Sequence, residues 1–176
     1  TVWRMGREGK AAAEVSEIEF FANAEDTELV VELTLRWMAE PFQPGSTLPK
    51  FAETLRAALP ELSGIAVFSP AAGTLVWEDV PEALQPVFGE PALIYKTRSA
   101  RYRVGAGSFF QTNRFLVDRL VELVTAGRDG GLALDLYAGV GLFSLMLSQT
   151  FREVTAVAAA PFAFHDLRHN SPSNVA

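Results

Sequence analysis

Residues 132–144 read LALDLYAGVGLFS, and this stretch decides the fold. Its first half is apolar except for Asp135, which is the pattern of a strand buried on both faces of a parallel sheet. Gly139 and Gly141 follow at once, and an apolar pattern then resumes at helical spacing up to Ser148. Strand, glycine turn and helix in this order predict the first unit of a parallel α/β sheet.

The glycine turn also predicts a ligand site. Glycine has no Cβ, so Gly139 and Gly141 would let a ligand lie against backbone N–H groups at the carboxyl edge of the strand. Asp135 would accept hydrogen bonds from a cationic or hydroxylated group of that ligand. The spacing D-x-x-x-G-x-G lacks the third glycine of the dinucleotide fingerprint, and an acid before the glycines suits a cationic sulfonium better than a pyrophosphate. A purely structural turn is the alternative.

Composition excludes several classes of protein. The chain has 176 residues, of which 49% are hydrophobic and 20% charged, which is typical of one globular domain or two small ones. No apolar run approaches the roughly 18 residues of a membrane span, and we expect a cytoplasmic protein without a signal peptide. The chain contains no cysteine, which excludes disulfides, thiolate metal sites and a cysteine nucleophile within these residues.

Residues 1–90 predict a small α+β domain of two hairpins and one helix. The expected elements are strands at 15–22 and 28–35, a helix at 48–59, and strands at 64–69 and 74–78. The helix places Leu48, Phe51 and Leu55 on one face. The proline-spaced residues 81–91 are the expected boundary region.

Residues 91–176 predict the start of an open α/β sheet. The expected elements are strands at 92–95 and 101–104, a helix with Asn113 as its N-cap, the strand at 132–136, a parallel strand at 153–159 and a helix from Pro161. In the helix after Asn113 the apolar residues at helical spacing are Phe115, Leu116, Leu120, Leu123 and Val124. A parallel sheet of two strands cannot bury both faces, so we expect either a partner or a piece of a longer protein, and we favour the piece.

Basic residues gather in this second half. The net charge is −6, yet basic residues outnumber acidic ones after residue 90. Four cations lie within eight residues, with two tyrosines beside or among them: Lys96, Arg98, Arg101, Arg103, Tyr95 and Tyr102. Such a run suits pairing with phosphates and stacking on bases. A solvent-exposed edge strand explains the basic run equally well, because charged side chains keep such a strand from pairing with other chains.

The motifs FFQTN at residues 109–113 and DLYAGVGLFS at 135–144, with the strand ending at Val157, resemble those of AdoMet-dependent RNA 5-methyluridine methyltransferases. The resemblance is specific from about residue 101 to 174 and rests on element order over 1–100. It implies an α/β fold, the start of a Rossmann-like class I methyltransferase sheet, preceded by the small α+β hairpin domain. In that family the enzymes methylate C5 of a uridine in tRNA or rRNA with S-adenosyl-L-methionine (AdoMet), so the resemblance implies AdoMet as cofactor and RNA as partner.

The resemblance assigns most of a cofactor pocket. Together with Asp135 from the strand pattern, the expected pocket residues are Gln111, Asp135, Tyr137, Gly139, Gly141, Leu142 and Ala158. The resemblance implies that Tyr137 packs along the cofactor and that the glycines lie beneath its methionine end. Leu142 occupies a position that is often a small polar residue. Ala158 stands where the family carries an acid that accepts hydrogen bonds from the ribose hydroxyls of the cofactor. Losing charge-assisted hydrogen bonds of this kind costs roughly 1.5–3 kcal/mol each, or tens- to hundreds-fold in affinity.

The resemblance also implies what these residues lack. The family's reaction needs a cysteine that adds to uracil C6 and a carboxylate base that removes the C5 proton. The family carries both beyond the point where this sequence stops, so we expect this chain alone to be inactive and its catalytic domain to be truncated. Lys96, Arg98, Arg101 and Arg103 are expected to contact RNA phosphates.

Two histidines and two phenylalanines are further candidates for a site. His165 and His169 are spaced four apart, but no cysteine or third histidine completes a zinc site, so we expect no metal. Phe109 and Phe110 would stack on a base or, as we favour, form a buried pair. The alternatives to an RNA methyltransferase are a small-molecule AdoMet methyltransferase and a non-catalytic RNA-binding or scaffold protein with a degenerate pocket.

Overall fold

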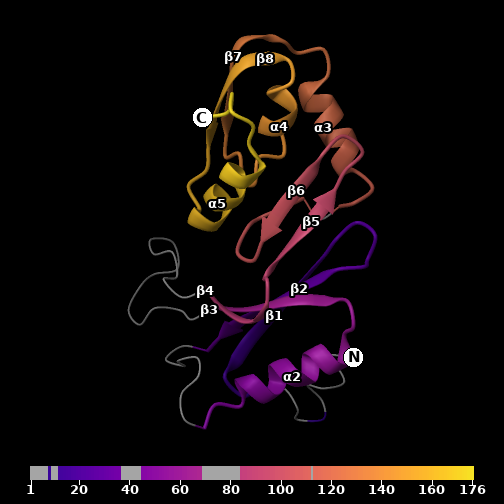
Figure 1. Cartoon of the computed structure of the whole chain (residues 1–176), viewed down its shortest axis with the longest axis vertical. Helices are drawn as coiled ribbons and strands as arrows, with labels where there is room; N and C mark the ends of the chain where they lie inside the picture. Colours follow the sequence, from indigo (N-terminus) through magenta and orange to yellow (C-terminus); the bar gives the residue numbers. More distant parts are fainter. Residues whose placement is uncertain (1–7, 9–11, 37–44, 69–83, 112) are drawn as a thin grey trace. The chain divides into compact units, whose positions relative to one another are not determined.

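A computed structural model describes residue 8 and residues 12–36, 45–68, 84–111 and 113–176. Its contacts divide the chain into two compact units, Thr1–Leu93 and Ile94–Ala176. Figure 1 shows a mixed α/β structure whose helices and strands are labelled along the chain. In these described ranges no helix is long and apolar enough to cross a membrane.

The first unit is built on a sheet with the strand order β1-β2-β3-β4. These strands are β1 (Val15–Ala22), β2 (Leu29–Leu35), β3 (Leu62–Phe68) and β4 (Leu84–Gly89). The predicted hairpin of β1 and β2 is confirmed as antiparallel, whereas β2 and β3 are parallel and β3 and β4 antiparallel. A parallel pair needs a crossover, and the helix α2 (Leu48–Ala58) lies in that connection.

The helix α2 follows the predicted pattern. Leu48, Phe51 and Leu55 recur on one face and are buried, and they belong to one core cluster with Val31 and Ile65 of the sheet. A proline occupies the first turn, where its missing N–H leaves no helical hydrogen bond unmade. The first unit therefore has a core of its own between helix and sheet.

The second predicted hairpin is only partly correct. The strand expected at 64–69 is present as β3, and the strand expected at 74–78 lies outside the described residues. The antiparallel neighbour of β3 is β4, which falls within residues 81–91, the stretch predicted to be a boundary. Residues 84–89 of this stretch form β4, an edge strand of the sheet, where a proline is tolerated.

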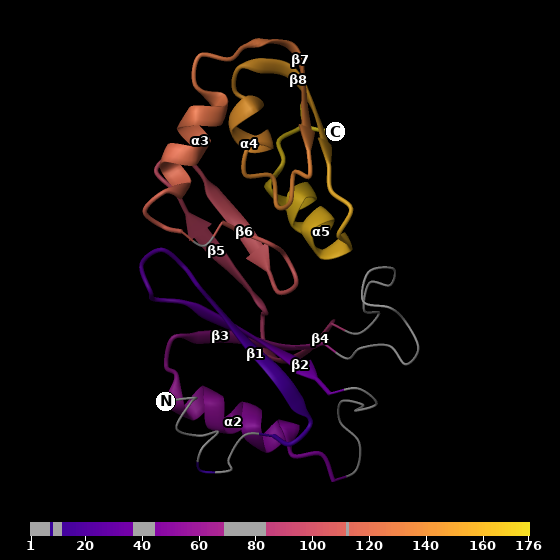
Figure 2. The same ribbon diagram turned by 180° about the vertical axis from the view of Figure 1, so that it is seen from behind.

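The second unit contains two small sheets. The first consists of β5 (Ala92–Lys96) and β6 (Arg101–Gly105), and the second of the parallel strands β7 (Gly130–Leu136) and β8 (Phe151–Val157). Three helices connect or follow them: α3 (Val117–Thr125), α4 (Ser144–Leu147) and α5 (Pro161–Asn170). In Figure 2, as in Figure 1, α5 lies beside β6 and α4 beside β8. The predicted order of strand, glycine turn, helix and parallel strand is confirmed.

The prediction that β7 is buried on both faces is wrong. Leu132, Leu134 and Leu136 are 63%, 60% and 57% exposed, whereas Asp135 on the opposite face is buried. Only β8 pairs with β7 within the described chain, and the last residues of the chain extend the sheet on the far side of β8. The apolar pattern predicted the strand correctly, but burial of both faces needs covering elements that the described residues do not supply.

The helix α3 begins later than predicted. Asn113 is not its N-cap: the Asn113 side chain accepts a hydrogen bond from Phe115 N at 3.1 Å, within a turn before the helix. The buried helical residues are Val117 and Val121. Three of the apolar residues noted at helical spacing are exposed instead: Phe115, Leu116 and Leu123.

Glu14 gives the first unit a pH-dependent contact. Its carboxylate accepts hydrogen bonds from the Thr47 hydroxyl at 2.7 Å and from Thr47 N at 2.8 Å, just before α2 begins. The hydroxyl bond is the largest cause that lowers the pKa of Glu14 from 4.5 to about 2. Because the folded state favours the ionised form, this contribution is complete above pH 4.5 and is lost as the pH falls toward 2.

We predict that Glu14→Gln flattens the pH dependence of the unfolding of the first unit between pH 4.5 and 2. Thermal unfolding followed by tryptophan fluorescence measures this, because all three tryptophans of the sequence lie before residue 94. Glu17→Gln, which removes the same charge from an exposed position on β1, is the control and should keep the decline. Equal pH profiles for the two variants would contradict the role of Glu14.

Candidate functional site

The glycine turn lies at the carboxyl end of β7, where open α/β sheets bind their ligands. Tyr137, Gly139 and Gly141 have φ angles of +61°, +57° and +92°, so left-handed residues alternate with ordinary ones. Ala138 N donates to Val157 O at 2.9 Å, which fastens the turn to the end of β8. Gly141 N donates to Ala138 O at 2.9 Å as well, so the backbone of the turn is held in a tight curve.

The two glycines of the turn serve different purposes. A Cβ on Gly141 would lie 2.9 Å from Leu167 Cδ1, so the Leu167 side chain of α5 would have to shift, and the φ of +92° favours glycine independently. A Cβ on Gly139 would meet only Phe109 O, at 3.7 Å, which is ordinary contact. The space beside Gly139 is therefore not filled by the core, and this side of the turn is open to a ligand.

Tyr137 is the most unusual residue of the turn. A non-glycine residue with a left-handed backbone stores strain of about 1–3 kcal/mol, and bulky side chains adopt it rarely. Tyr137 is 92% exposed, so burial does not compensate for this strain. Strain of this kind, without a structural benefit, is typical of functional sites.

A small pocket opens beside the turn. Its lining comes from residues 109–111 and from the turn between residues 137 and 143. It brings together four of the predicted site residues: Gln111, Tyr137, Gly139 and Leu142. Its volume of about 60 Å³ is below the roughly 300–1,000 Å³ of a small-molecule site, so it would hold only part of a ligand. A larger hollow of about 310 Å³ also reaches Gln111 and runs along α3.

Asp135 has a partner inside the protein. It is buried, and its Oδ2 accepts a hydrogen bond at 2.5 Å from Ser144 Oγ, at the first residue of α4. The carboxylate thereby fixes the end of β7 to the helix that follows the turn. This contact gives Asp135 a role in shaping the turn, and its predicted contact with a ligand stays a prediction.

Leu142 and Ala158 frame the turn with apolar side chains. Leu142 is buried, and its carbonyl accepts a hydrogen bond from the Tyr102 hydroxyl at 3.0 Å. Burial raises the pKa of Tyr102 to about 12, so this hydroxyl remains a donor throughout the ordinary pH range. Ala158 directly follows Val157, the last residue of β8, and its methyl group offers no hydrogen-bond acceptor at the position next to the turn.

The four predicted RNA-contact residues do not form one exposed set. Lys96 and Arg101 are exposed, and the Arg98 side chain is 87% exposed with its Nε 3.6 Å from Asp118 Oδ2. Arg103 differs, because its guanidinium forms an ion pair with Asp166, and only 19% of its side chain is exposed. Arg103 is therefore engaged within the fold, and its predicted contact with a phosphate stays a prediction.

The aromatic residues near this basic run are mostly unavailable for stacking on bases. Tyr95 and Tyr102 are buried and pack on Phe110, with ring centroids 4.6 Å and 5.9 Å apart. The predicted role of these two tyrosines in base stacking is therefore wrong. Phe110 is buried as favoured, but Phe109 is exposed, so the expected buried pair is only half present.

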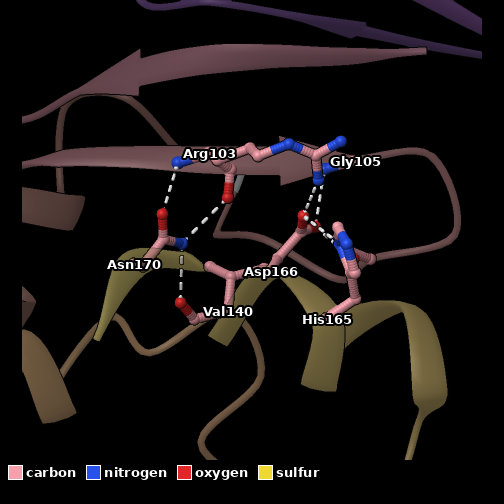
Figure 3. A network of polar contacts seen from close by, with 7 residues as sticks. Arg103, Gly105, Val140, His165, Asp166 and Asn170 are labelled. Atoms are coloured by element: carbon pink, nitrogen blue, oxygen red, sulfur yellow. Dashed lines mark hydrogen bonds and ion pairs between the residues drawn. The ribbon is translucent and has the colours of Figure 1, made fainter. Parts of the chain in front are cut away.

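Sequence reasoning missed two residues of α5 that support the turn, Asp166 and Asn170 (Figure 3). Asp166 Oδ2 accepts hydrogen bonds from Gly105 N and Ser108 Oγ, both at 2.6 Å. The Asn170 side chain binds the backbone of Arg103 and of Val140. The available signal was an acid and an amide four residues apart on one helix face, but their partners lie on other elements, which the sequence pattern does not show. In the described ranges no cluster of histidine, cysteine or acidic residues could hold a metal ion.

Comparison with known proteins places residues 85–175 in the family model described as tRNA (Uracil-5-)-methyltransferase. The chain is 34% identical over 99 residues to an uncharacterized RNA methyltransferase of Streptomyces avermitilis, covering 53% of this chain and 23% of that protein. It is 31% identical over 91 residues to a tRNA (uracil(54)-C(5))-methyltransferase of Pyrococcus horikoshii, covering 52% of this chain and 22% of that protein. It is 31% identical over 100 residues to a 23S rRNA (uracil(747)-C(5))-methyltransferase of Pyrococcus furiosus, covering 53% and 24%. The chain thus matches less than a quarter of the length of these relatives.

Solved structures agree on the fold. The crystal structure of Pyrococcus abyssi tRNA (uracil-54, C5)-methyltransferase in complex with S-adenosyl-L-homocysteine matches with a TM-score of 0.66 at 19% identity, over 96% of this chain and 41% of that chain. The M. jannaschii tRNA m1G37 methyltransferase matches with a TM-score of 0.52 at 17% identity, over 96% and 46%. The mixed α/β architecture of this chain is therefore one that methyltransferase structures share.

Proposed function

The chain belongs to the tRNA (uracil-5-)-methyltransferase family, as its motifs predicted, and on this premise we propose that it contributes to methyl transfer from AdoMet to C5 of a uridine in tRNA or rRNA. Because the chain matches less than a quarter of the length of its curated relatives, the activity, the substrate and the partners are all proposals. Relatives named for tRNA and for 23S rRNA both support RNA as the substrate class.

The observation that carries the proposal is the strained, exposed Tyr137 beside the glycine turn. Its backbone is left-handed and the residue is 92% exposed, at the edge of the pocket that Gln111 and Gly139 also line. An exposed aromatic face attracts a cation, and the sulfonium of AdoMet is cationic. We assign to Tyr137 and Gln111 the binding of the methionine end of AdoMet, and to Gly139 the open backbone on which it lies.

The remaining turn residues would act on this site indirectly. Asp135 would hold α4 against the end of β7 through Ser144, and Gly141 and Leu142 would seat the turn on the core. The residues fit the methionine end better than the ribose, because Ala158 supplies no acceptor for the ribose hydroxyls. When bound, AdoMet supplies the electrophilic methyl group; the chain contains no cysteine, so these residues provide no thiol to add to uracil C6.

RNA binding is assigned to the exposed cations of the β5–β6 hairpin and the turn between its strands. Lys96, Arg98 and Arg101 would pair with backbone phosphates, which gives affinity without sequence preference. Arg103 is left out of this set because of its ion pair with the buried Asp166. The hairpin belongs to the same unit as the glycine turn, apart from the first two residues of β5.

A second candidate function is a non-catalytic RNA-binding or scaffold protein that keeps the fold. Ala158 and Leu142 favour it, because Ala158 supplies no acceptor for the ribose hydroxyls and Leu142 is apolar at a position that is often small and polar. Tight RNA binding by a folded chain that gives no AdoMet binding would support this candidate. A small-molecule AdoMet methyltransferase would instead bind AdoMet and show no affinity for RNA.

We predict that Tyr137→Gly leaves the stability of the chain unchanged or raises it by up to about 1 kcal/mol while weakening AdoMet binding about tenfold. Glycine adopts the φ of +61° without strain but offers no ring to the cofactor. Asp26→Gly is the matched control, because Asp26 also has a left-handed backbone, with φ +56°, in a turn of the first unit. Urea unfolding and calorimetric titration of AdoMet measure the two effects. Unchanged AdoMet affinity in the Tyr137 variant would refute the assignment.

We predict that binding of an unmodified tRNA transcript weakens with salt, and that Arg101→Ala lowers the slope of log K against log salt by roughly 0.7–0.9. Each phosphate contact releases about one condensed counterion, so a lost contact lowers the slope. Arg128→Ala, which removes an exposed cation outside the hairpin, is the control and should leave the slope unchanged. Fluorescence anisotropy at several salt concentrations provides the slopes, and equal slopes for both variants would remove the hairpin from the RNA site.

A further inference from the structure

We propose that Asn170 is a positioning residue that fixes the glycine turn to strand β6, so that α5 sets the geometry of the cofactor pocket without touching the cofactor. The role of the pocket rests on the proposed function, whereas the fixing of the turn is a property of the chain itself. Figure 3 shows the Asn170 side chain between the backbone of Arg103 and that of Val140.

The Asn170 carboxamide uses its acceptor and its donors on the backbone. Its Oδ1 accepts from Arg103 N at 2.7 Å, and its Nδ2 donates to Arg103 O and to Val140 O, both at 2.9 Å. Binding both N–H and C=O of one strand residue imitates the pairing that a neighbouring strand would make. The second donor then holds a carbonyl that lies between Gly139 and Gly141.

Few other side chains can make this arrangement. A carboxylate has no donor, so an aspartate would present negative charge to two carbonyl oxygens. A hydroxyl has a single donor and cannot serve Arg103 O and Val140 O at the same time. The geometry therefore depends on an amide of this length.

Asp166, one helical turn before Asn170, holds the other wall of the pocket. Its side chain is 1% exposed, pairs with Arg103, and binds Gly105 N and Ser108 Oγ. A Cβ on Gly105 would lie 3.1 Å from Asp166 Oδ2, which is tighter than most real contacts. The segment that Asp166 fixes leads directly to residues 109–111, which line the pocket opposite the turn.

A third bond from β6 supports the same turn. The Tyr102 hydroxyl donates to Leu142 O at 3.0 Å, next to the point where Gly141 packs on Leu167 of α5. The carbonyls of residues 140 and 142 are thus both held by groups anchored on β6 or α5. Both walls of the pocket are therefore fixed to one support, which is how a binding site keeps its geometry within a fraction of an ångström.

The test compares Asn170→Ala with Asn174→Ala. Asn174 is a matched control, because its Nδ2 also donates to two backbone carbonyls, Ser148 O at 2.9 Å and Phe151 O at 3.2 Å, but neither belongs to the turn. Both variants should lose similar stability. Amide hydrogen exchange of Ala138 and Gly141, measured by NMR relative to the β7–β8 amides, should rise about tenfold only in Asn170→Ala.

AdoMet affinity supplies the second measurement. We expect Asn170→Ala to bind AdoMet about tenfold more weakly than the unchanged chain, and Asn174→Ala to bind within about twofold of it. Equal exchange at the turn in both variants would overturn the proposal, and so would equal AdoMet affinities of the two variants when the unchanged chain binds AdoMet. If Asn170→Ala does not fold, the pair Asn170→Ser and Asn174→Ser makes the same comparison, because a hydroxyl cannot hold both carbonyls.

The two measurements separate this proposal from the proposed function. Faster exchange at the turn in Asn170→Ala, together with no AdoMet binding by the folded, unchanged chain, would refute the cofactor assignment and support the positioning of the turn. Normal AdoMet binding with unchanged exchange and affinity in Asn170→Ala would refute the positioning role and support the cofactor assignment.

Discussion

The ion pair between Arg103 and the buried Asp166 is the interaction on which the second unit depends. The Asp166 side chain is 1% exposed, and its oxygens also bind Gly105 N and Ser108 Oγ. Removing one partner of a buried pair leaves an uncompensated charge and costs about 3–5 kcal/mol, so α5 is held to β6. Asn170, on the same helix face, extends this attachment to the glycine turn. A hairpin, a helix and a turn that are far apart in the sequence thus become one support.

That support explains how a strained site can persist. Tyr137 has a left-handed backbone and an exposed ring, and such a conformation is kept only when the surrounding structure determines it. The turn is held by Val157 O before the glycines, by Asn170 between them and by Tyr102 after them. Family membership, the shared fold and this turn together favour AdoMet binding as the role of the unit.

Local sequence patterns predicted the helices and strands. Burial and side-chain partners were harder to predict, because they depend on contacts between residues far apart in the sequence. The strand–glycine turn–helix unit and α2 could be predicted because periodicity and glycine positions act over a few residues. The exposure of the β7 leucines could not be predicted, because burial depends on which elements cover a strand. Arg101 and Arg103 look equivalent in the sequence, yet only Arg103 meets Asp166, which is 63 residues away. The role of Asp166 was missed for the same reason, since its partners lie on another element.

Residue 158 offers the most direct test of the claim that the turn after β7 is an AdoMet site. Calorimetric titration of AdoMet into the chain and into Ala158→Glu compares the pocket without and with an acceptor for the ribose hydroxyls. Two charge-assisted hydrogen bonds of roughly 1.5–3 kcal/mol each predict that the glutamate variant binds at least about a hundredfold more tightly. Absence of binding by both folded proteins, or equal affinities, would contradict the account.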